Sequence, residues 1–155
     1  MVKKAYQAEI SDASTARAFN SNASASLKYS TEICREIKGK QLDKAIAFLK
    51  RIINHEEFLP LRKFNKKVAH RKGESKSGVK SGRYPEKTCE TFVNLLESVK
   101  ANADFKGLDT EKLLIVHAFA SQGFSRYSFQ PKGKISGKRR KRKVAHIEVI
   151  VREGK

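Results

Sequence analysis

The side chains best suited to acid–base chemistry or metal binding are four histidines and two cysteines: His55, His70, His117, His146, Cys34 and Cys89. The histidines lack the HxH and HExxH spacings of metal sites, and the cysteines lack the close pairing of a zinc ribbon or redox motif. The sequence also lacks Walker and dinucleotide-binding glycine patterns. Catalysis requires a positioned nucleophile, base or metal. The sequence therefore predicts a protein that is not an enzyme and holds no cofactor and no metal.

One metal alternative stays open at this stage. His117 and His146 fall in two expected strands, so a metal between them is an alternative if those strands pair. No carboxylate or thiol accompanies them, which favours packing or RNA contact instead. His70 lies in a basic loop and is interpreted as an RNA contact. Cys34 and Cys89 are interpreted as buried thiols in a reducing compartment, which favours the cytoplasm.

Charge gives the strongest indication of a partner. The 155 residues include 34 Lys and Arg against 16 Asp and Glu, for a formal net charge of +18. Such an excess destabilises a compact state unless an anionic partner neutralises it, and the large candidates are nucleic acid and an anionic membrane. The chain lacks an apolar run near the roughly 20 residues that span a bilayer, and its ends lack secretion and lipidation signals. We therefore expect a nucleic acid and no membrane.

Two segments concentrate the positive charge. Residues 60–83 contain nine Lys and Arg against one acid and show no helical or strand period, which predicts a loop that RNA holds in place. Residues 120–143 contain nine Lys and Arg and no acid, with aromatic residues interleaved. Aromatic rings stack on unpaired bases while cations reach phosphates. For Phe124 and Phe129, packing across the segment itself is an equally weighted alternative.

Helical spacing of apolar residues predicts three helices. The expected helices cover 31–37 after an N-cap at Ser30, then 42–53, then a third that Pro85 opens and Gly107 ends. Four acids on these helices, Glu32, Glu36, Asp43 and Glu97, are predicted to lie on solvated faces. The small, polar stretch 11–26 buries too little to order itself, so it is interpreted as a mobile tail or an arm that orders on RNA. A short strand over 23–29 is left open.

Two strands, 113–119 and 144–151, are rich in β-branched and apolar residues. If they pair antiparallel with His117 opposite His146, the centre falls between Pro131 and Lys132, inside a Pro-x-Gly turn sequence. This predicts one long hairpin extending about 45 Å at ~3.3 Å per residue. Such a ribbon is at most marginally stable alone. We expect RNA to surround it.

Short segments along residues 30–151 resemble a known family. They include Glu36-Ile37-Lys38-Gly39-Lys40, Pro60-Leu61-Arg62-Lys63-Phe64-Asn65, Gly82-Arg83-Tyr84-Pro85 and His146-Ile147-Glu148-Val149-Ile150. In this order they resemble the universal large-subunit ribosomal protein called L twenty-two in bacteria and L seventeen in eukaryotes. The similarity is to the archaeal and eukaryotic form, with its longer central loop.

The resemblance implies an α+β fold: a small three-stranded antiparallel sheet packed by about three helices, with a long protruding β-hairpin. It implies one domain over 1–155, with an arm and short strand over 1–29 and a helical body over 30–119 that includes the basic loop 60–83. The extended hairpin would cover 112–151, with its tip near 131–133. The implied role is that of a structural constituent of the cytoplasmic large ribosomal subunit, which supports assembly. Implied partners are large-subunit rRNA, neighbouring ribosomal proteins and the nascent polypeptide, with no homo-oligomer.

The predicted RNA contacts are basic and polar side chains of the body and the hairpin. They are Arg17, Lys38, Lys40, Arg62, Lys63, Asn65, Lys66, Lys67, His70, Arg71, Arg83, Lys87, Arg126, Lys132, Lys134, Lys138, Arg139, Arg140, Lys141, Arg142 and Lys143. The resemblance implies that the hairpin tip lines the peptide exit tunnel through Phe129, Gln130, Pro131, Lys132 and Gly133. The alternative is a free nucleic-acid-binding regulatory or chromatin protein, which explains the charge but neither the hairpin nor the series of motifs. An RNA-processing enzyme would need a catalytic constellation that the sequence lacks.

Overall fold

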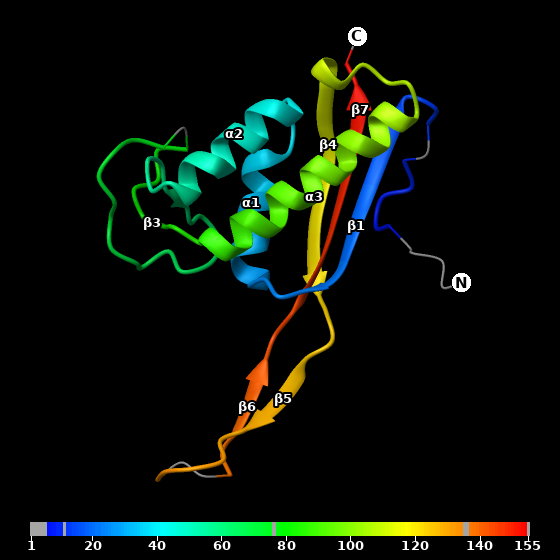
Figure 1. Cartoon of the computed structure of the whole chain (residues 1–155). Helices are drawn as coiled ribbons and strands as arrows, with labels where there is room; N and C mark the ends of the chain where they lie inside the picture. Colours follow the sequence, from blue (N-terminus) through cyan, green and yellow to red (C-terminus); the bar gives the residue numbers. More distant parts are fainter. Residues whose placement is uncertain (1–5, 11, 76, 135–136, 155) are drawn as a thin grey trace.

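The apolar core lies between one face of a three-stranded sheet and the helices that cover it (Figure 1). The computed structural model describes residues 6–10, 12–75, 77–134 and 137–154. The sheet has the order β1 (Thr15–Ala23), β7 (Ala145–Glu153), β4 (Leu113–Gln122), and both neighbouring pairs are antiparallel. This confirms the α+β fold with a three-stranded antiparallel sheet.

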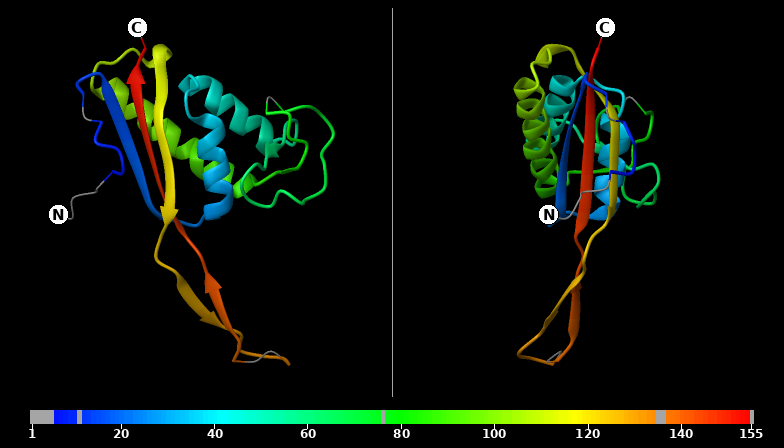
Figure 2. Two further views of the ribbon diagram at one scale, coloured as in Figure 1. Left: turned by 180° about the vertical axis from the view of Figure 1, so that it is seen from behind. Right: turned by 90° about the vertical axis from the view of Figure 1, so that its right-hand side faces the viewer.

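Three helices provide the other half of the core: α1 (Leu27–Ile37), α2 (Leu42–Ile53) and α3 (Glu86–Phe105), with a short 3-10 turn over Thr110–Lys112. Helix α3 crosses the sheet in front of β1 and β7, α2 packs on α3, and α1 packs against β4 (Figures 1 and 2). The α3 stripe is buried as its spacing predicts, with Phe92, Leu96 and Val99 inaccessible to solvent.

The helix boundaries agree with the sequence in two cases out of three. Helix α2 has the predicted bounds, and α3 begins one residue after Pro85 and ends before Gly107, whose φ is +74°. Helix α1 begins earlier than predicted, because Ser30 is not its N-cap. Ser30 lies inside the helix, where its N–H donates to the Ser26 carbonyl at 2.8 Å.

The interpretation of this N-terminal stretch as a tail or arm is wrong for residues 15–23. Residues Thr15–Ala23 form edge strand β1 along β7, so the open question of a strand over 23–29 is answered by an earlier and longer strand. Ala16 and Ala18 are buried because their small side chains let α3 approach closely. Helix α3 also contacts the backbone of β1, because Asn102 Nδ2 donates to the Arg17 carbonyl at 3.0 Å. The pairing of β1 with β7, a strand near the other end of the sequence, thus orders a stretch whose own side chains bury little area.

The basic loop 60–83 is also more structured than its sequence predicts. Its ends pair as two short strands, β2 (Leu59–Pro60) and β3 (Gly82–Arg83), and His70 forms an isolated bridge with Ser81. The Ser81 hydroxyl donates to the Lys66 carbonyl at 3.0 Å. Contacts within the protein therefore hold this loop together at several points.

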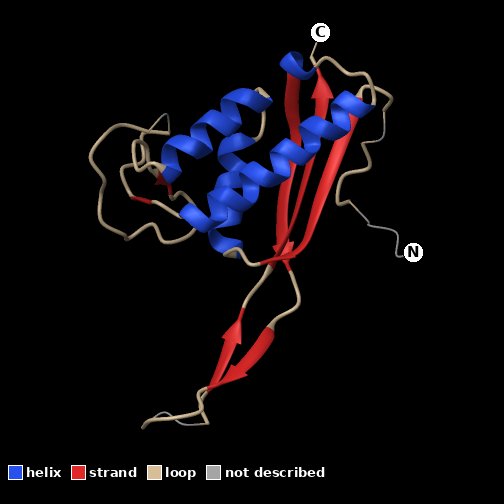
Figure 3. Ribbon diagram, in the orientation of Figure 1, coloured by secondary structure: helices blue, strands red, loops and turns tan. Residues whose placement is uncertain are grey.

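The hairpin continues beyond the body as β5 (Arg126–Phe129) and β6 (Arg139–Arg142), which project away from the helices (Figure 3). This confirms the protruding hairpin. The predicted register is wrong, however: His117 pairs with Ile150, and His146 pairs with Ser121.

The register differs by four residues because the turn is longer than a Pro-x-Gly turn. Gln130 N–H donates to the Lys138 carbonyl at 3.2 Å, so the tip loop runs from Pro131 to Gly137. A bulge between Ile115 and His117 changes the pairing again by one residue over the start of β4.

Candidate nucleic-acid interface

The two strands beyond the body, with the tip loop between them, form a ribbon over residues 126–142. Arg126 pairs with Arg142 and Ser128 pairs with Arg140, while Tyr127 pairs with Lys141 and Phe129 pairs with Arg139. Every side chain of β5 and β6 is exposed except that of Ser128, which is half-buried. Like charges directly across an antiparallel pair destabilise it. An anion on the ribbon would relieve this repulsion.

Phe124 and Phe129 do not pack across the hairpin. Phe129 is 67 % exposed and Phe124, just before β5, is 73 % exposed. The packing alternative is therefore wrong for both rings. Tyr127 differs, because the Arg139 guanidinium carbon lies 3.6 Å from the centroid of its ring. A guanidinium at this distance makes a cation–π contact.

The predicted tip residues lie on the outgoing side of the turn. Phe129 ends β5, and Gln130 both donates to Lys138 and accepts from Gly137 N–H at 2.9 Å. Lys132 and Gly133 are exposed in the loop, where Gly133 has a φ of +90°. The centre of the tip lies closer to Lys134 than to the predicted 131–133, because the turn is longer.

Asn22 organises the junction between the body and the ribbon. Its side-chain oxygen accepts the Phe124 N–H at 2.9 Å, and its own N–H donates to His146 Nδ1 at 3.1 Å. Its φ of +53° is left-handed, which Asn tolerates better than most residues. Across the junction, Gly123 N–H donates to the Val144 carbonyl at 2.9 Å. The ribbon thus begins from a hydrogen-bonded base.

A buried carboxylate anchors the start of the basic loop. Glu32 on α1 is 1 % exposed, and it accepts the backbone N–H groups of Lys63 and Phe64 at 2.7 Å each and that of Arg62 at 3.3 Å. One turn along α1, Glu36 accepts from Arg62 Nη2 at 2.7 Å. The prediction that Glu32 and Glu36 lie on solvated faces is wrong. Asp43 and Glu97 are exposed, as predicted.

Some cations of the loop contact other groups of the protein, and others are exposed to solvent. Arg62 is half-buried and paired with Glu36, and Arg71 lies 5.4 Å from the Tyr84 ring centroid while its Nε donates to the Gly82 carbonyl. Arg83, at the end of the loop, is half-buried, and the other predicted loop contacts have exposed side chains. These are Lys63, Asn65, Lys66, Lys67 and His70. The exposed group is the part of the loop best placed to meet phosphate.

Four further predicted contacts are dispersed over the body. Arg17 lies on β1 with its guanidinium carbon 5.1 Å from the Tyr6 ring centroid, and Lys38 is exposed after α1. Lys40 Nζ lies 4.3 Å from the Phe48 ring centroid. Lys87 is exposed in the first turn of α3, close in sequence to the half-buried Arg83. The structure therefore groups the predicted residues on the ribbon and the loop and leaves these cations apart from the ribbon.

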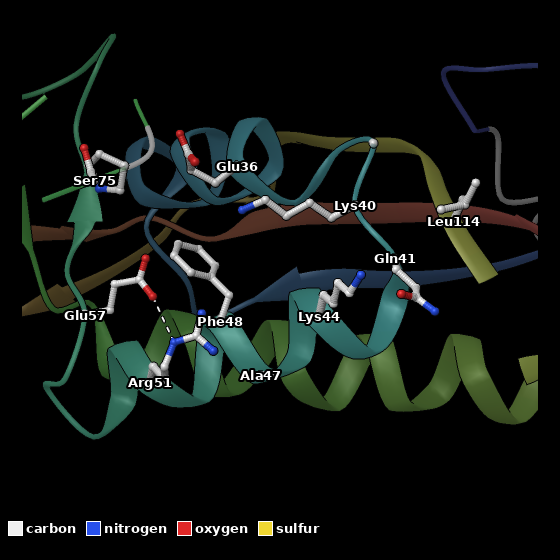
Figure 4. A pocket seen from close by; sticks show the side chains of 12 residues that line it. Glu36, Lys40, Gln41, Lys44, Ala47, Phe48, Arg51, Glu57, Ser75 and Leu114 are labelled. Carbon is white, nitrogen blue, oxygen red and sulfur yellow. Dashed lines mark hydrogen bonds and ion pairs between the residues drawn. The ribbon is translucent and has the colours of Figure 1, made fainter. Parts of the chain in front are cut away.

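A hollow of about 510 Å³ opens between α2 and the bend that follows α1 (Figure 4). Lys40, Lys44 and Phe48 line it, and Leu114 closes one end. Three of its charged lining residues are already paired, because Arg51 Nε lies 2.9 Å from Glu57 Oε2 and Glu36 binds Arg62. These three charges thus serve contacts within the protein.

The histidines and cysteines occupy structural positions. His117 Nε2 lies 2.8 Å from Oε1 of the buried Glu148, and His146 stacks on Phe19 with ring centroids 5.7 Å apart. Over the described residues, no three His, Cys, Asp or Glu side chains form a group that could hold a metal ion. Cys34 and Cys89 are free, buried thiols, and burial raises the pKa of each to about 12.

The acidic anchor of the loop is the feature that sequence reasoning missed. Glu32 and Glu36 are four residues apart and directly precede Ile33 and Ile37, which form the buried stripe of the same helix. Acids bordering an apolar stripe at its own spacing are a detectable signal for partly buried carboxylates.

None of the described helices is both long enough and apolar enough to cross a membrane.

Comparisons with known proteins agree with this architecture. The family model described as ribosomal protein L22p/L17e matches residues 18–152. The chain is 39 % identical over 153 residues to large ribosomal subunit protein uL22 of Methanococcus vannielii, covering 99 % of each chain. It is 42 % identical over 149 residues to the protein of that name from Ignicoccus hospitalis, covering 94 % of this chain and 92 % of the relative. A match of this extent and identity shows that the chain belongs to the ribosomal protein L22p/L17e family.

Proposed function

We propose that this protein is a structural constituent of the cytoplasmic large ribosomal subunit that binds rRNA through its basic loop and ribbon and supports assembly. In this proposal, neighbouring ribosomal proteins contact the body, and the hairpin tip lines the nascent-peptide exit tunnel. The carrying observation is the ribbon, whose exposed side chains are cationic or aromatic and whose strands place arginines opposite one another. Family membership and the names of the relatives support the same assignment.

The concentrated positive charge of the ribbon favours RNA binding. The residues 120–143 carry nine Lys and Arg without an acid, so half of the net charge of +18 lies in this short stretch. Phosphate neutralisation releases counterions, and affinity for RNA should fall steeply as salt rises. A log–log slope near zero would contradict the proposal.

The division between loop and ribbon is testable in cells with tagged variants recovered from purified large subunits. In the first variant, an Asn-Gly turn replaces residues 124–143, joining Gly123 and Val144, which are already hydrogen-bonded. Incorporation should survive, because the core and the loop remain, while passage of nascent chains through the tunnel should change.

The second variant reverses charge in the loop at Lys66 and Lys67, two exposed residues. Arg62 is avoided, because its loss would leave Glu36 without its ion-pair partner. Its matched control reverses Lys44 and Lys50, exposed residues of α2 that are not predicted contacts. We expect the loop variant to be depleted from subunits and the control to be retained. Loss of incorporation on ribbon deletion, with normal incorporation of the loop variant, would reverse the proposed division.

The runner-up, a free regulatory or chromatin protein, predicts a different distribution. On a sucrose gradient at high magnesium and moderate salt, it would separate from ribosomes, whereas a subunit constituent stays with the large subunit in stoichiometric amount. The full-length match to ribosomal proteins favours the subunit.

A further inference from the structure

The two faces of the ribbon have different chemistry. Cross-strand partners in an antiparallel pair share a face, and neighbours along a strand alternate between faces. Arg126, Arg142, Ser128 and Arg140 therefore lie on one face, the cationic face. The other, the aromatic face, carries Tyr127, Lys141, Phe129 and Arg139.

We propose that the aromatic face binds unpaired RNA bases by stacking, while the cationic face binds the phosphates of an adjacent RNA segment. This inference rests on the proposed function and assigns one chemical partner to each side of the ribbon. The alternative occupant of the aromatic face is the nascent polypeptide, which the experiment below distinguishes.

The geometry on the aromatic face favours bases. Phe129 lies opposite Arg139, is 67 % exposed and has no neighbour among the ring contacts of the described residues. The Arg139 guanidinium already covers the Tyr127 ring at 3.6 Å. A guanidinium plane held in this way offers a flat, charged surface on which a base stacks. Single-stranded RNA matches this combination, because its bases meet the rings while its phosphates meet Arg139 and Lys141.

The cationic face favours phosphate instead. Arg126 and Arg142 lie directly opposite each other, and Arg140 follows on the same side next to Ser128. This face has cations and one small hydroxyl side chain, and no ring on which a base could stack. Its repulsion is relieved by an anion that spans both strands. A phosphate backbone is such an anion.

The first experiment measures binding of the full chain to two probes, an oligouridylate strand and an RNA duplex of the same length, over a salt series. The double variant Tyr127→Leu/Phe129→Leu should lose about 10-fold in affinity for oligouridylate, with the salt slope and duplex binding unchanged. Arg126→Gln/Arg142→Gln should weaken binding to both probes and reduce the salt slope by up to about 2.

Three controls keep the result specific. Phe105→Leu removes a ring that is 93 % exposed at the end of α3, away from the ribbon, and should change nothing. Tyr127→Phe preserves the ring and should retain affinity. Phe129→Leu alone leaves the contact between Arg139 and Tyr127 and should give a partial loss. Equal losses for Phe105→Leu and Phe129→Leu would overturn the inference.

The second experiment identifies the occupant inside the subunit. A photoreactive benzoylphenylalanine at position 129 is irradiated in ribosomes that carry a stalled nascent chain. Cross-links to rRNA support the inference, and cross-links to the nascent chain alone overturn it. The proposed function is tested separately by sedimentation of the wild-type protein with large subunits, a result that does not depend on what occupies the aromatic face.

Discussion

In the body, by which we mean the sheet with α1 to α3 and the loop, Phe92, Leu49 and Ile147 are fully buried and acids such as Glu32 and Glu36 hold basic segments in place. In the ribbon, the only apolar side chains on β5 and β6 are exposed aromatics, and arginine faces arginine. The body supplies acids for some of its own cations, such as Glu36 for Arg62, whereas the ribbon has no acid and must obtain its counterions from outside. One chain thus combines a region that folds by burial with a region shaped for an external anion.

The comparison also explains where charge is tolerated. A buried carboxylate is stable only when its partners satisfy it, and Glu32 has three backbone donors. The ribbon has exposed cations and the segment 120–143 has no acid, so these cations have no neutralising carboxylate of their own segment. Salt should therefore affect the ribbon more than the body.

The largest contrast is expected in thiol reactivity. Cys34 and Cys89 should react with a disulfide reagent at least about 1000-fold more slowly than a free thiol, because only the rare unfolded molecules expose them. A cysteine placed in the ribbon by Ser128→Cys should react rapidly. Rapid reaction of the two native thiols in the folded protein would contradict the closed body.

The same thiols give the body a pH dependence. Their ordinary pKa is 9.0, and burial raises the pKa of each to about 12 in the folded protein. As pH rises from about 9 towards 12, the unfolded chain loses protons that the folded chain keeps, so stability falls over this window. The variant Cys34→Ala/Cys89→Ala should show a smaller decline in denaturation midpoint.

The next contrast is in packing. Phe92→Ala should lower the free energy of unfolding by about 3–5 kcal/mol, because Phe92 is a fully buried core residue of α3. Phe129→Ala should change it by less than about 0.5 kcal/mol, since that ring is exposed. Chemical denaturation of the free protein measures both. Similar losses for the two variants would show that the ribbon belongs to the cooperative fold.

An intermediate effect is expected at the loop anchor. Glu32→Gln keeps the size of the side chain but removes its charge, and it should cost about 1.5–3 kcal/mol. Amide exchange at Lys63 and Phe64 should accelerate, because their acceptor is weakened. The control Glu97→Gln changes an exposed acid of α3 and should have little effect. Unchanged exchange at Lys63 would mean that the loop is held by other contacts.

The smallest effect is expected at the junction. Asn22→Ala removes the acceptor of the Phe124 N–H and places alanine at a φ of +53°, for a loss of about 1 kcal/mol. Asn22→Gly removes the same acceptor without the backbone cost, so the difference between the variants measures the strain. Faster amide exchange at Phe124 in both variants is the expected readout.

The sequence was most informative where burial is local. The spacing of Leu42, Leu49 and Ile52 predicted α2 with its observed bounds, and the apolar stripe of α3 was buried as expected. Strand β1 was missed, because Ala16 and Ala18 bury too little area to produce a strong pattern, and their burial depends on distant α3. Glu32 was missed for a related reason, since its donors come from a loop about 30 residues away.

For the hairpin, the sequence predicted the element but not its register. Its existence could be predicted from two apolar strands around a basic segment, but its register depended on the length of the tip loop. Pro131 and Gly133 were read as a tight turn, although the closing hydrogen bond joins Gln130 and Lys138. The RNA contacts of the individual ribbon residues stay predictions.

Asn22 lies where the ribbon leaves the body, so this junction is the point about which the ribbon would rotate. From Arg126 to the centre of the tip the chain extends about 26 Å, at ~3.3 Å per residue over about eight residues. A rotation of about 10° at the pivot would move the tip by about 5 Å, roughly the spacing of two adjacent strands. Asn22 makes one hydrogen bond to each arm of the hairpin. These two bonds thus help to set the angle between the body and the ribbon, and any change in that angle displaces the tip more than the base. Small substitutions at this pivot should displace the tip by far more than they disturb the body.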